Sequence, residues 1–287
     1  MVSLRIERES QVEDSSWKEK FIPTREGVSL DEFPGRRSIL VIAPHPDDDV
    51  LGAGGTMAEA AGRQVAVFSV YMTDGRGSPR AELSLSDEEM ALRREKEAVA
   101  ALKGLRAAGG FFLRRGSLEL EGEGGRQTKR ELINILQGIL PEEVFLPSPY
   151  ERHATHQRCI SLAIEALRAA KNVKPALLGY SLWGCFWGGK RRVLRDITPH
   201  IKKKVEAVLA HASQIAYKNY QQGILGKNNF EAIFWESHEP QKMAFAENFL
   251  EMSEFLANIN LSVEEFMRKD MELFISKYVN VSGSSRP

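Results

Sequence analysis

Cysteine and long apolar runs are both scarce in this chain of 287 residues. Its two cysteines, Cys159 and Cys185, exclude a disulfide-rich scaffold and indicate a reducing compartment. No apolar segment approaches the roughly 20 residues that span a bilayer, and the charged start MVSLRIERESQVEDSSWKEKF lacks the apolar core of a signal peptide. We therefore expect a cytoplasmic protein that has no membrane partner.

An excess of charge of either sign is also lacking, because 39 Lys and Arg residues balance 39 Asp and Glu residues. A formal net charge of zero argues against a basic face for nucleic acid, so the expected partner is a small molecule. Hydrophobic residues make up 43% of the chain, an ordinary share for a globular protein. The length suits one large α/β domain or two small ones.

Strand and helix patterns alternate along the chain from residue 38 onward. Strands are expected at 38–44, 64–72, 109–113, 142–148, 176–184, 191–198 and 230–235. Helices are expected at 55–62, 86–104, 128–140, 155–171 and 199–220, and Ser86 and Glu89 have the spacing of a capping box. This alternation predicts an α/β fold in which crossover helices cover both faces of a mostly parallel sheet.

Both ends of the chain differ from this pattern. Residues 1–36 mix charges with few apolar residues and contain Pro23 and Pro34, so they are interpreted as an N-terminal extension. Residues 238–287 are predicted to be a C-terminal helical extension. Its first helix would carry one apolar stripe, and its second would start at a Ser262–Glu265 capping box; the apolar residues are Phe245, Phe249, Met252, Leu256, Phe266, Met271 and Phe274.

The apolar faces of this C-terminal segment must be buried somewhere. Packing on the parent domain is the favoured explanation, and a subunit contact or a lid over the strand ends is the alternative. Because phenylalanine and methionine are enriched in the cores of interfaces, we expect a homo-oligomer to which this segment contributes.

The stretch APHPDDDV places His45, Asp47, Asp48 and Asp49 directly after a predicted buried strand. Three adjacent carboxylates repel one another, and either solvent or a cation must offset that repulsion. Imidazole and carboxylate are ligands that divalent metals accept, and His45 and Asp48 are close enough in a turn to hold one ion. Of the neighbours Asp47 and Asp48, one can bind the ion while the other faces the reacting water.

The segment HATH, His153 to His156, follows another predicted strand, and TDGRGS follows a third. Ligands of open α/β sheets bind beyond the carboxyl ends of the strands, so these segments can converge on one crevice. The two histidines share a face of the first helical turn, and one can bind metal while its partner faces the substrate. Each motif alone also fits a solvated turn, but together they favour a site with three metal ligands.

A competing interpretation begins with Gly52, Gly54 and Gly55, which start like a dinucleotide-binding fingerprint. Met57 stands where the third glycine of that fingerprint would fall, and three acidic residues would repel a pyrophosphate. We therefore expect these glycines to let a helix pack closely on the sheet.

Further segments add to the opening motif in a fixed order between about residues 38 and 235: PHPDDD, GAGGT, MTDG, ALRREKEA, HATH, DIT and KKKVEAVLAHASQ. In these segments the chain resembles the LmbE-like, PIG-L-type N-acetylglucosaminyl deacetylases. The resemblance implies a Rossmann-like deacetylase domain at 37–237 that binds zinc or ferrous iron. It also implies a substrate of the N-acetylglucosamine type, or its conjugate, from which an N-acetyl group is removed.

The resemblance further implies a role for each matching residue. The metal ligands would be His45, Asp48 and His156. Asp47 would be the general base, His153 would polarise the oxyanion or protonate the amine, and Arg94 would bind the substrate. These roles suit amide hydrolysis, because a poor electrophile and a weak nucleophile both need activation at neutral pH.

The chain departs from the family pattern at three positions. Asp49 replaces a glutamate, Thr155 replaces the aspartate of HxDH, and Gly116 stands where the family often has an aspartate that binds sugar hydroxyls. Two alternatives therefore stay open. One is a non-catalytic sugar-binding or assembly protein that retains the pocket, and the other is a metal-dependent amidase or esterase acting on a non-sugar acyl group.

Several other residues have both a functional and a structural explanation. Trp183, Phe186 and Trp187 could stack on a sugar or belong to the core, and Arg76 and Arg80 could hold an anion or keep a loop soluble. We expect Lys202 to Lys204 to form a solvated helix face and His211 to be a structural, hydrogen-bonded histidine.

Overall fold

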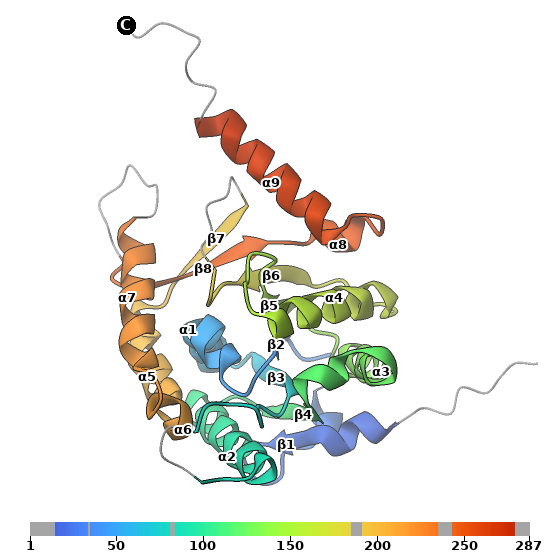
Figure 1. The fold of residues 1–287 in the computed structure, drawn as a ribbon, viewed down its shortest axis with the longest axis vertical. Coiled ribbons are helices and arrows are strands. Elements are labelled where there is room, and N and C mark those ends of the chain that lie inside the picture. The colour runs from blue at the N-terminus through green and yellow to red at the C-terminus, as the bar shows by residue number, and fades with distance from the viewer. Residues whose placement is uncertain (1–14, 34, 81–83, 185–190, 235–242, 279–287) are drawn as a thin grey trace, which may run out of the picture.

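One sheet runs through the protein, and in the residues that the computed structural model describes it has eight strands in the order β1-β4-β3-β2-β5-β6-β8-β7 (Figure 1). The described residues are 15–33, 35–80, 84–184, 191–234 and 243–278. The strands are β1 Phe21–Pro23, β2 Ser38–Ala43, β3 Ala66–Thr73, β4 Gly109–Arg115, β5 Glu143–Pro147, β6 Ala176–Tyr180, β7 Arg192–Asp196 and β8 Ala246–Glu251.

Helices follow most of the strands. The longer ones are α1 Asp48–Gly62, α2 Asp87–Leu105, α3 Gly122–Ile139, α4 Ala154–Ala169, α5 Ile201–Leu209, α7 Tyr220–Ile233 and α9 Val263–Tyr278. The short ones are η1 Ser15–Lys20, η2 Leu30–Glu32, η3 Ser117–Leu120, η4 Thr198–His200, α6 Ala212–Ile215 and α8 Glu254–Ala257. Among the described residues, no helix combines the length and the apolar character that a membrane span needs.

The strands β4, β3, β2, β5 and β6 are parallel, whereas β1, β8 and β7 pair antiparallel at the two sides. The chain leaves β2 for β3 and β4 and then returns to form β5 on the other side of β2. The carboxyl ends of β2 and β5 therefore flank the point where the strand order reverses, which is where α/β sheets bind their ligands.

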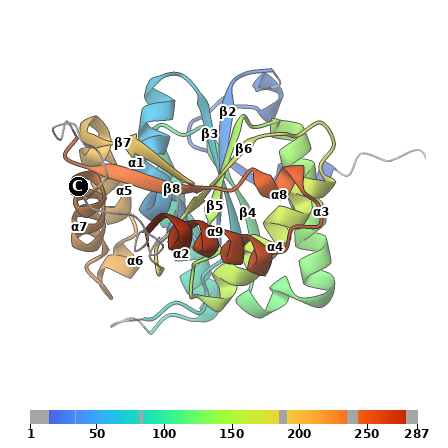
Figure 2. The same ribbon diagram turned by 90° about the horizontal axis from the view of Figure 1, so that it is seen from above.

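Both faces of the sheet are buried under helices, as the views in Figures 1 and 2 show. Along β2, Leu40 and Ile42 belong to a core cluster that includes residues of α3 and α4, while Val41 belongs to a cluster that includes residues of α1, α2 and α5. Alternate side chains of a strand point to opposite faces, so an all-apolar strand can serve two cores. The predicted mostly parallel α/β fold is confirmed.

The helix over 86–104 is also confirmed, together with its cap. Ser86 Oγ accepts a hydrogen bond from the Glu89 amide at 3.2 Å, and the Glu89 carboxylate accepts one from the Ser86 amide at 2.8 Å. These two bonds satisfy donors that the first helical turn would otherwise leave unpaired.

The prediction of a helical stripe at Phe245, Phe249, Met252 and Leu256 is wrong. Residues Ala246–Glu251 form β8, which lies between β6 and β7 and belongs to the sheet. Phe249 packs on one face of the sheet and Leu250 on the other. A strand that is buried on both faces does not show the alternation of apolar and polar residues by which strands are identified. The helix predicted at Ser262 exists as α9, and Ser262 Oγ accepts from the Glu265 amide at 3.0 Å.

Only part of the apolar face of α9 packs on the parent domain. Phe266 is buried and stacks on Phe255 with ring centroids 4.6 Å apart. Met271, Leu273 and Ile275 are exposed further along the same helix. The predicted homo-oligomer stays a prediction.

Three further expectations need correction. Residues Phe230–Ile233 end helix α7 instead of forming a strand, and the predicted helix at 199–220 is divided into η4, α5 and α6. Lys204 is not on a solvated face, because its ammonium group is fully buried 2.6 Å from the Glu247 carboxylate. The N-terminal extension also contributes β1 to the sheet.

Candidate active site

The three adjacent carboxylates that follow β2 point in three directions at the start of α1. Asp47 Oδ1 lies 2.7 Å from Arg94 Nη2, and Asp48 Oδ2 lies 3.0 Å from His45 Nδ1. Asp49 is buried and accepts hydrogen bonds from Ser69 and Tyr71 at 2.7 and 2.6 Å. The positive end of the helix dipole also favours carboxylates in a first turn. Each carboxylate therefore has its own partner, which reduces the repulsion among them.

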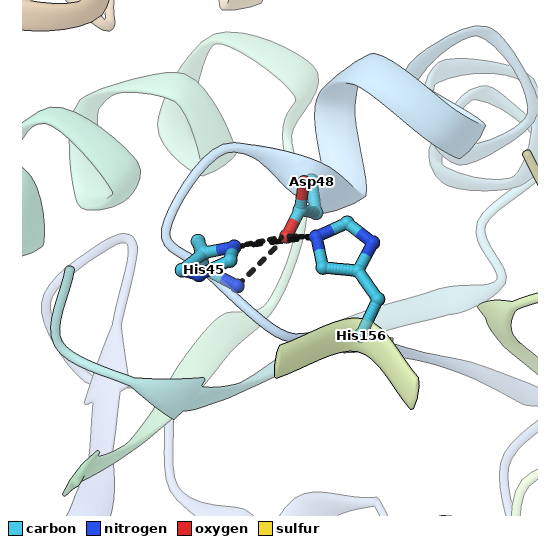
Figure 3. A group of neighbouring side chains, drawn as sticks. All are labelled: His45, Asp48 and His156. Atoms are coloured by element: carbon cyan, nitrogen blue, oxygen red, sulfur yellow. Dashed lines mark hydrogen bonds and ion pairs between the residues drawn. The ribbon is translucent and has the colours of Figure 1, made fainter. Parts of the chain in front are cut away.

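His45, Asp48 and His156 bring one potential ligand atom each to a common point (Figure 3). His156 Nε2 lies 3.2 Å from Asp48 Oδ2 and 3.3 Å from His45 Nδ1. His45 and Asp48 come from the turn between β2 and α1, whereas His156 comes from the first turn of α4, beyond β5. The two segments that the sequence analysis singled out thus meet at the carboxyl ends of neighbouring strands.

The spacing of these three atoms suits a divalent metal. A tetrahedral zinc ion with ligands at about 2.0 Å holds those ligand atoms about 3.3 Å from one another. The three pairs of atoms are separated by 3.0, 3.2 and 3.3 Å. Asp48 and His156 are buried and His45 is partly exposed, so one side of the group remains open toward the cavity.

Strong electrostatic coupling joins Asp48 to His156. Burial by itself raises the pKa of Asp48, but the His156 and His45 imidazoles outweigh it and hold the pKa well below its usual range. Burial likewise lowers the pKa of His156, but the carboxylates of Asp48 and Glu151 raise it to about 10. Positive charge at this point therefore stabilises the Asp48 carboxylate, and metal binding there would release a proton.

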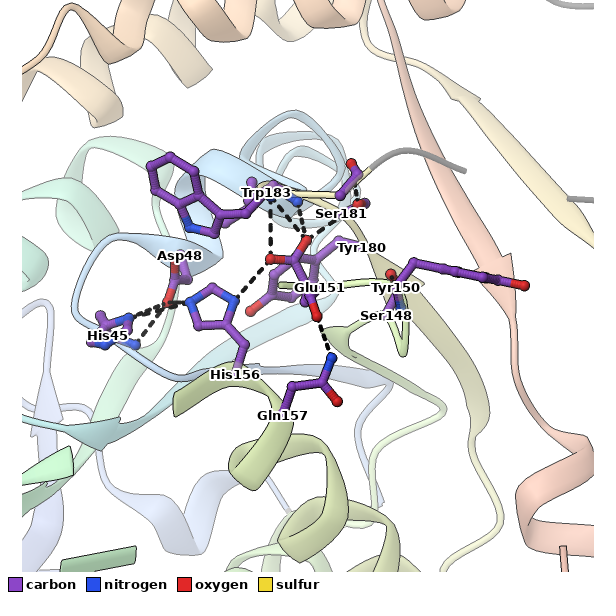
Figure 4. Close-up of polar contacts among 12 residues, drawn as sticks. His45, Asp48, Ser148, Tyr150, Glu151, His156, Gln157, Tyr180, Ser181 and Trp183 are labelled. Atoms are coloured by element: carbon purple, nitrogen blue, oxygen red, sulfur yellow. Dashed lines mark hydrogen bonds and ion pairs between the residues drawn. The ribbon is translucent and has the colours of Figure 1, made fainter. Parts of the chain in front are cut away.

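Glu151 is a site residue that the sequence analysis did not identify. Its buried carboxylate lies 3.1 Å from His156 Nδ1, on the side of the ring away from Asp48 (Figure 4). Histidines that bind metal through one nitrogen usually donate the other N–H to a carboxylate or carbonyl. The signal in the sequence is Thr155, because it replaces the acid of HxDH that would orient or charge-balance a neighbouring histidine.

Asp47 and Arg94 form a buried pair at the wall of the site. Arg94 Nη1 also donates to Ser78 Oγ at 2.5 Å, so an ion pair and a hydrogen bond together fix the guanidinium. Asp47 and Arg94 line a cavity of about 200 Å³ together with His45 and Asp48. The substrate-binding role of Arg94 stays a prediction, while its contact with Asp47 is a feature that the sequence did not indicate.

His153 lines the same cavity at the N-cap of α4. Its ring centroid lies 5.1 Å from that of His45 and 5.0 Å from that of His156. Partial burial is the main cause that lowers the pKa of His153. Repulsion from the neighbouring His45 and His156 rings lowers it further. A neutral imidazole at neutral pH can donate a hydrogen bond to a developing oxyanion.

Trp183 forms part of the cavity wall and contacts Tyr220, with ring centroids 6.2 Å apart. Trp183 is 41% exposed, and Lys218 Nζ lies 5.4 Å from its ring centroid. Stacking on a sugar therefore stays a prediction for Trp183, and Phe186 and Trp187 lie outside the described residues. Next to Gly116, Ser117 also lines the cavity.

The remaining candidates do not line this cavity. Arg76 pairs with Asp74 at 2.6 Å and Arg80 pairs with Asp87, so carboxylates already neutralise both guanidinium groups. His211 is buried as expected, but neither ring nitrogen has a hydrogen-bond partner among the described residues. Burial lowers the pKa of His211 to about 4.

Sequence comparison finds relatives over most of the chain. A diacetylchitobiose deacetylase from Thermococcus kodakarensis is 28% identical over 234 residues, which are 77% of this chain and 80% of that protein. A probable N-acetyl-alpha-D-glucosaminyl L-malate deacetylase from Bacillus anthracis is 28% identical over 225 residues, covering 71% and 93% of the two chains.

Structural comparison agrees with these relatives. The N,N'-diacetylchitobiose deacetylase from Pyrococcus horikoshii, solved with an inhibitor, superposes with a TM-score of 0.66 at 26% identity, covering 80% of this chain and 90% of that one. Residues 40–167 match the family model for GlcNAc-PI de-N-acetylases, PIG-L. This match spans β2 to α4 and therefore includes His45, Asp48 and His156. Residues 40–167 of the chain are thus a PIG-L-type, LmbE-like domain.

Proposed function

We propose that the protein is a metal-dependent hydrolase that removes the N-acetyl group from an amino sugar of the N-acetylglucosamine type or from its conjugate. The observation that carries this proposal is the meeting of His45, Asp48 and His156 beside Asp47 at the carboxyl ends of β2 and β5. The named activities of the relatives from Thermococcus kodakarensis and Bacillus anthracis support an N-acetylated amino sugar as substrate.

His45, Asp48 and His156 would hold zinc or ferrous iron in this proposal. A bound ion of this kind supplies Lewis acidity, which polarises the amide carbonyl and makes water a better nucleophile at neutral pH. Asp47 lies beside these residues without sharing their common point, and its carboxylate lines the cavity. These features support a role for Asp47 in accepting a proton from the attacking water and a role for Asp48 in binding the ion.

His153 and Arg94 complete the proposed machinery. The neutral His153 ring would donate a hydrogen bond to the oxyanion that forms from the amide carbonyl. Protonation of the departing amine requires an acid, and Asp47 after it has accepted a proton or a protonated His153 could serve. Arg94 keeps Asp47 oriented toward the cavity and presents a positive charge there.

An acetate-release assay tests this function against its alternatives. The substrates are N-acetylglucosamine, N,N'-diacetylchitobiose, an N-acetylglucosaminyl malate and simple acetamides, each with protein loaded with zinc or ferrous iron. Release from one or more sugars, lost after chelation, is the expected result. Hydrolysis of acetamides alone would indicate an amidase, and sugar binding without acetate release would indicate a non-catalytic protein.

A further inference from the structure

The Glu151 carboxylate is fully buried and collects hydrogen bonds from two different parts of the candidate site (Figure 4). Glu151 precedes α4 and lies five positions before His156. Among the described residues, no lysine or arginine forms an ion pair with this carboxylate. A carboxylate that is buried without a basic side chain needs several donors to be tolerated.

The first set of contacts involves His156. Glu151 Oε2 lies 3.1 Å from Nδ1, while Nε2 on the opposite side of the ring lies 3.2 Å from Asp48 Oδ2. A proton held on Nδ1 by Glu151 leaves the lone pair of Nε2 free for a cation. With a divalent cation bound, the charges of Asp48 and Glu151 would also balance that of the ion.

The second set of contacts involves the segment after β6. The Trp183 amide donates to Oε1 at 3.1 Å and to Oε2 at 3.2 Å, the Ser181 hydroxyl donates to Oε1 at 3.2 Å, and the Leu182 amide donates to Oε1 as well. This segment carries the Trp183 indole, which forms part of the cavity wall. The position of that aromatic wall is therefore tied to the same carboxylate as His156.

We propose that Glu151 is a positioning residue with two tasks, which are to set the proton on His156 for metal binding and to hold the Trp183 segment at the cavity. The first task rests on the proposed function, because it assumes a metal at His45, Asp48 and His156. The second task does not depend on metal.

Glu151→Gln separates the two tasks because an amide has one acceptor and one donor group. If the amide oxygen keeps the bonds to Leu182 and Trp183, its NH₂ group faces His156 Nδ1 and forces the proton of a neutral ring onto Nε2. We expect the dissociation constant for zinc to rise about 10- to 100-fold, as is typical when an outer-shell partner of a metal ligand is lost. Zinc affinity is measured by competition with a chromophoric chelator.

Glu151→Ala removes both sets of contacts. Hydrogen exchange followed by NMR should show protected amides at Leu182 and Trp183 in the wild type and in Glu151→Gln, and loss of that protection in Glu151→Ala. The control is Glu165→Gln on the exposed side of the same helix α4, which should keep both the zinc affinity and the protection. Thermal melting of the metal-free variants shows whether each is folded under the assay conditions.

Either of two results would overturn the inference: wild-type zinc affinity in Glu151→Gln, or wild-type amide protection in a folded Glu151→Ala. Failure of the wild type itself to bind zinc or iron is a different outcome. It would contradict the proposed function and the first task, whereas amide exchange would still decide whether Glu151 holds the Trp183 segment.

Discussion

Arg94 Nη2 lies 2.7 Å from Asp47 Oδ1, and both residues are buried at the wall of the cavity. Asp47 is the N-cap residue of α1 and Arg94 belongs to α2, so this ion pair joins the two helices beside the candidate metal site. The pair gives each charge a partner and directs the proposed base toward the cavity. Four predictions test this arrangement and the surrounding core.

Asp47→Asn should lower the turnover of acetate release about 100- to 10,000-fold, because the amide cannot accept the proton of water. The metal content after dialysis should stay at the wild-type level, since the three proposed ligands are unchanged. Asp48→Asn is the matched comparison, and it should lose the metal. Near wild-type turnover of Asp47→Asn would place the general base elsewhere.

Arg94→Met should lower the free energy of unfolding by about 3 kcal/mol, because the Asp47 carboxylate would remain largely buried without its counter-ion. Urea denaturation of the metal-free protein measures this change. Arg93→Met is the control on the same helix, since Arg93 is more exposed and pairs with Glu97 at 3.1 Å. Arg93→Met should lower the free energy of unfolding by less than about 1 kcal/mol. An equal loss in both variants would argue against a special role for the Asp47–Arg94 pair.

Lys204→Met should destabilise the protein by about 3–5 kcal/mol, because it leaves the buried Glu247 carboxylate uncompensated. The Glu247 carboxylate also accepts hydrogen bonds from the Gly55 and Thr56 amides in α1, both at 2.8 Å. Glu247 therefore connects α5, β8 and α1. Adding Glu247→Gln to Lys204→Met should recover part of the loss, since the unpaired charge disappears. Lys202→Met, at an exposed position of the same helix, should change stability little, and a comparable loss there would refute this explanation.

His211 should make the protein less stable in acid. Its pKa in the folded state is lowered to about 4, below the usual value near 6.5, because burial disfavours the charged ring. Below pH 6.5 the His211 ring binds a proton in the unfolded chain but not in the folded protein. The free energy of unfolding that is present above pH 6.5 is therefore lost as the pH falls toward 4.

The variant His211→Gln isolates this contribution. Between pH 7 and pH 4 the wild type should lose about 3 kcal/mol more of its unfolding free energy than the variant does. Urea titrations of both proteins across this range, with chelator present, give the difference. Parallel stability curves would show that His211 is protonated in the folded protein or exposed to water.

The amino-acid pattern predicts the central part of the sheet and the two segments that form the candidate metal site. The strands around β2 and β5 are short apolar runs, and parallel strands bring their carboxyl ends to one edge. His45 and Asp48 follow one of these strands and the HATH segment follows the other, so the local pattern together with one rule of topology predicts that the two segments meet. The choice of His156 over His153 as the third ligand came from the family resemblance. The Ser86–Glu89 cap was equally predictable, because both of its bonds lie within one helical turn.

The identity of β8 and the partners of the buried charges depend on tertiary packing. The spacing of Phe245, Phe249 and Met252 suits a helix, but the segment is buried on both sides between β6 and β7, where alternation is no longer visible. In the sequence Lys204 resembles its neighbour Lys202, and only its buried partner Glu247, 43 residues away, distinguishes the two. The proposed role of Glu151 likewise depends on contacts with His156 and with Trp183, which lies 32 residues further on. Contacts at such separations depend on how helices and strands pack, and the periodicity of a single segment carries no information about them.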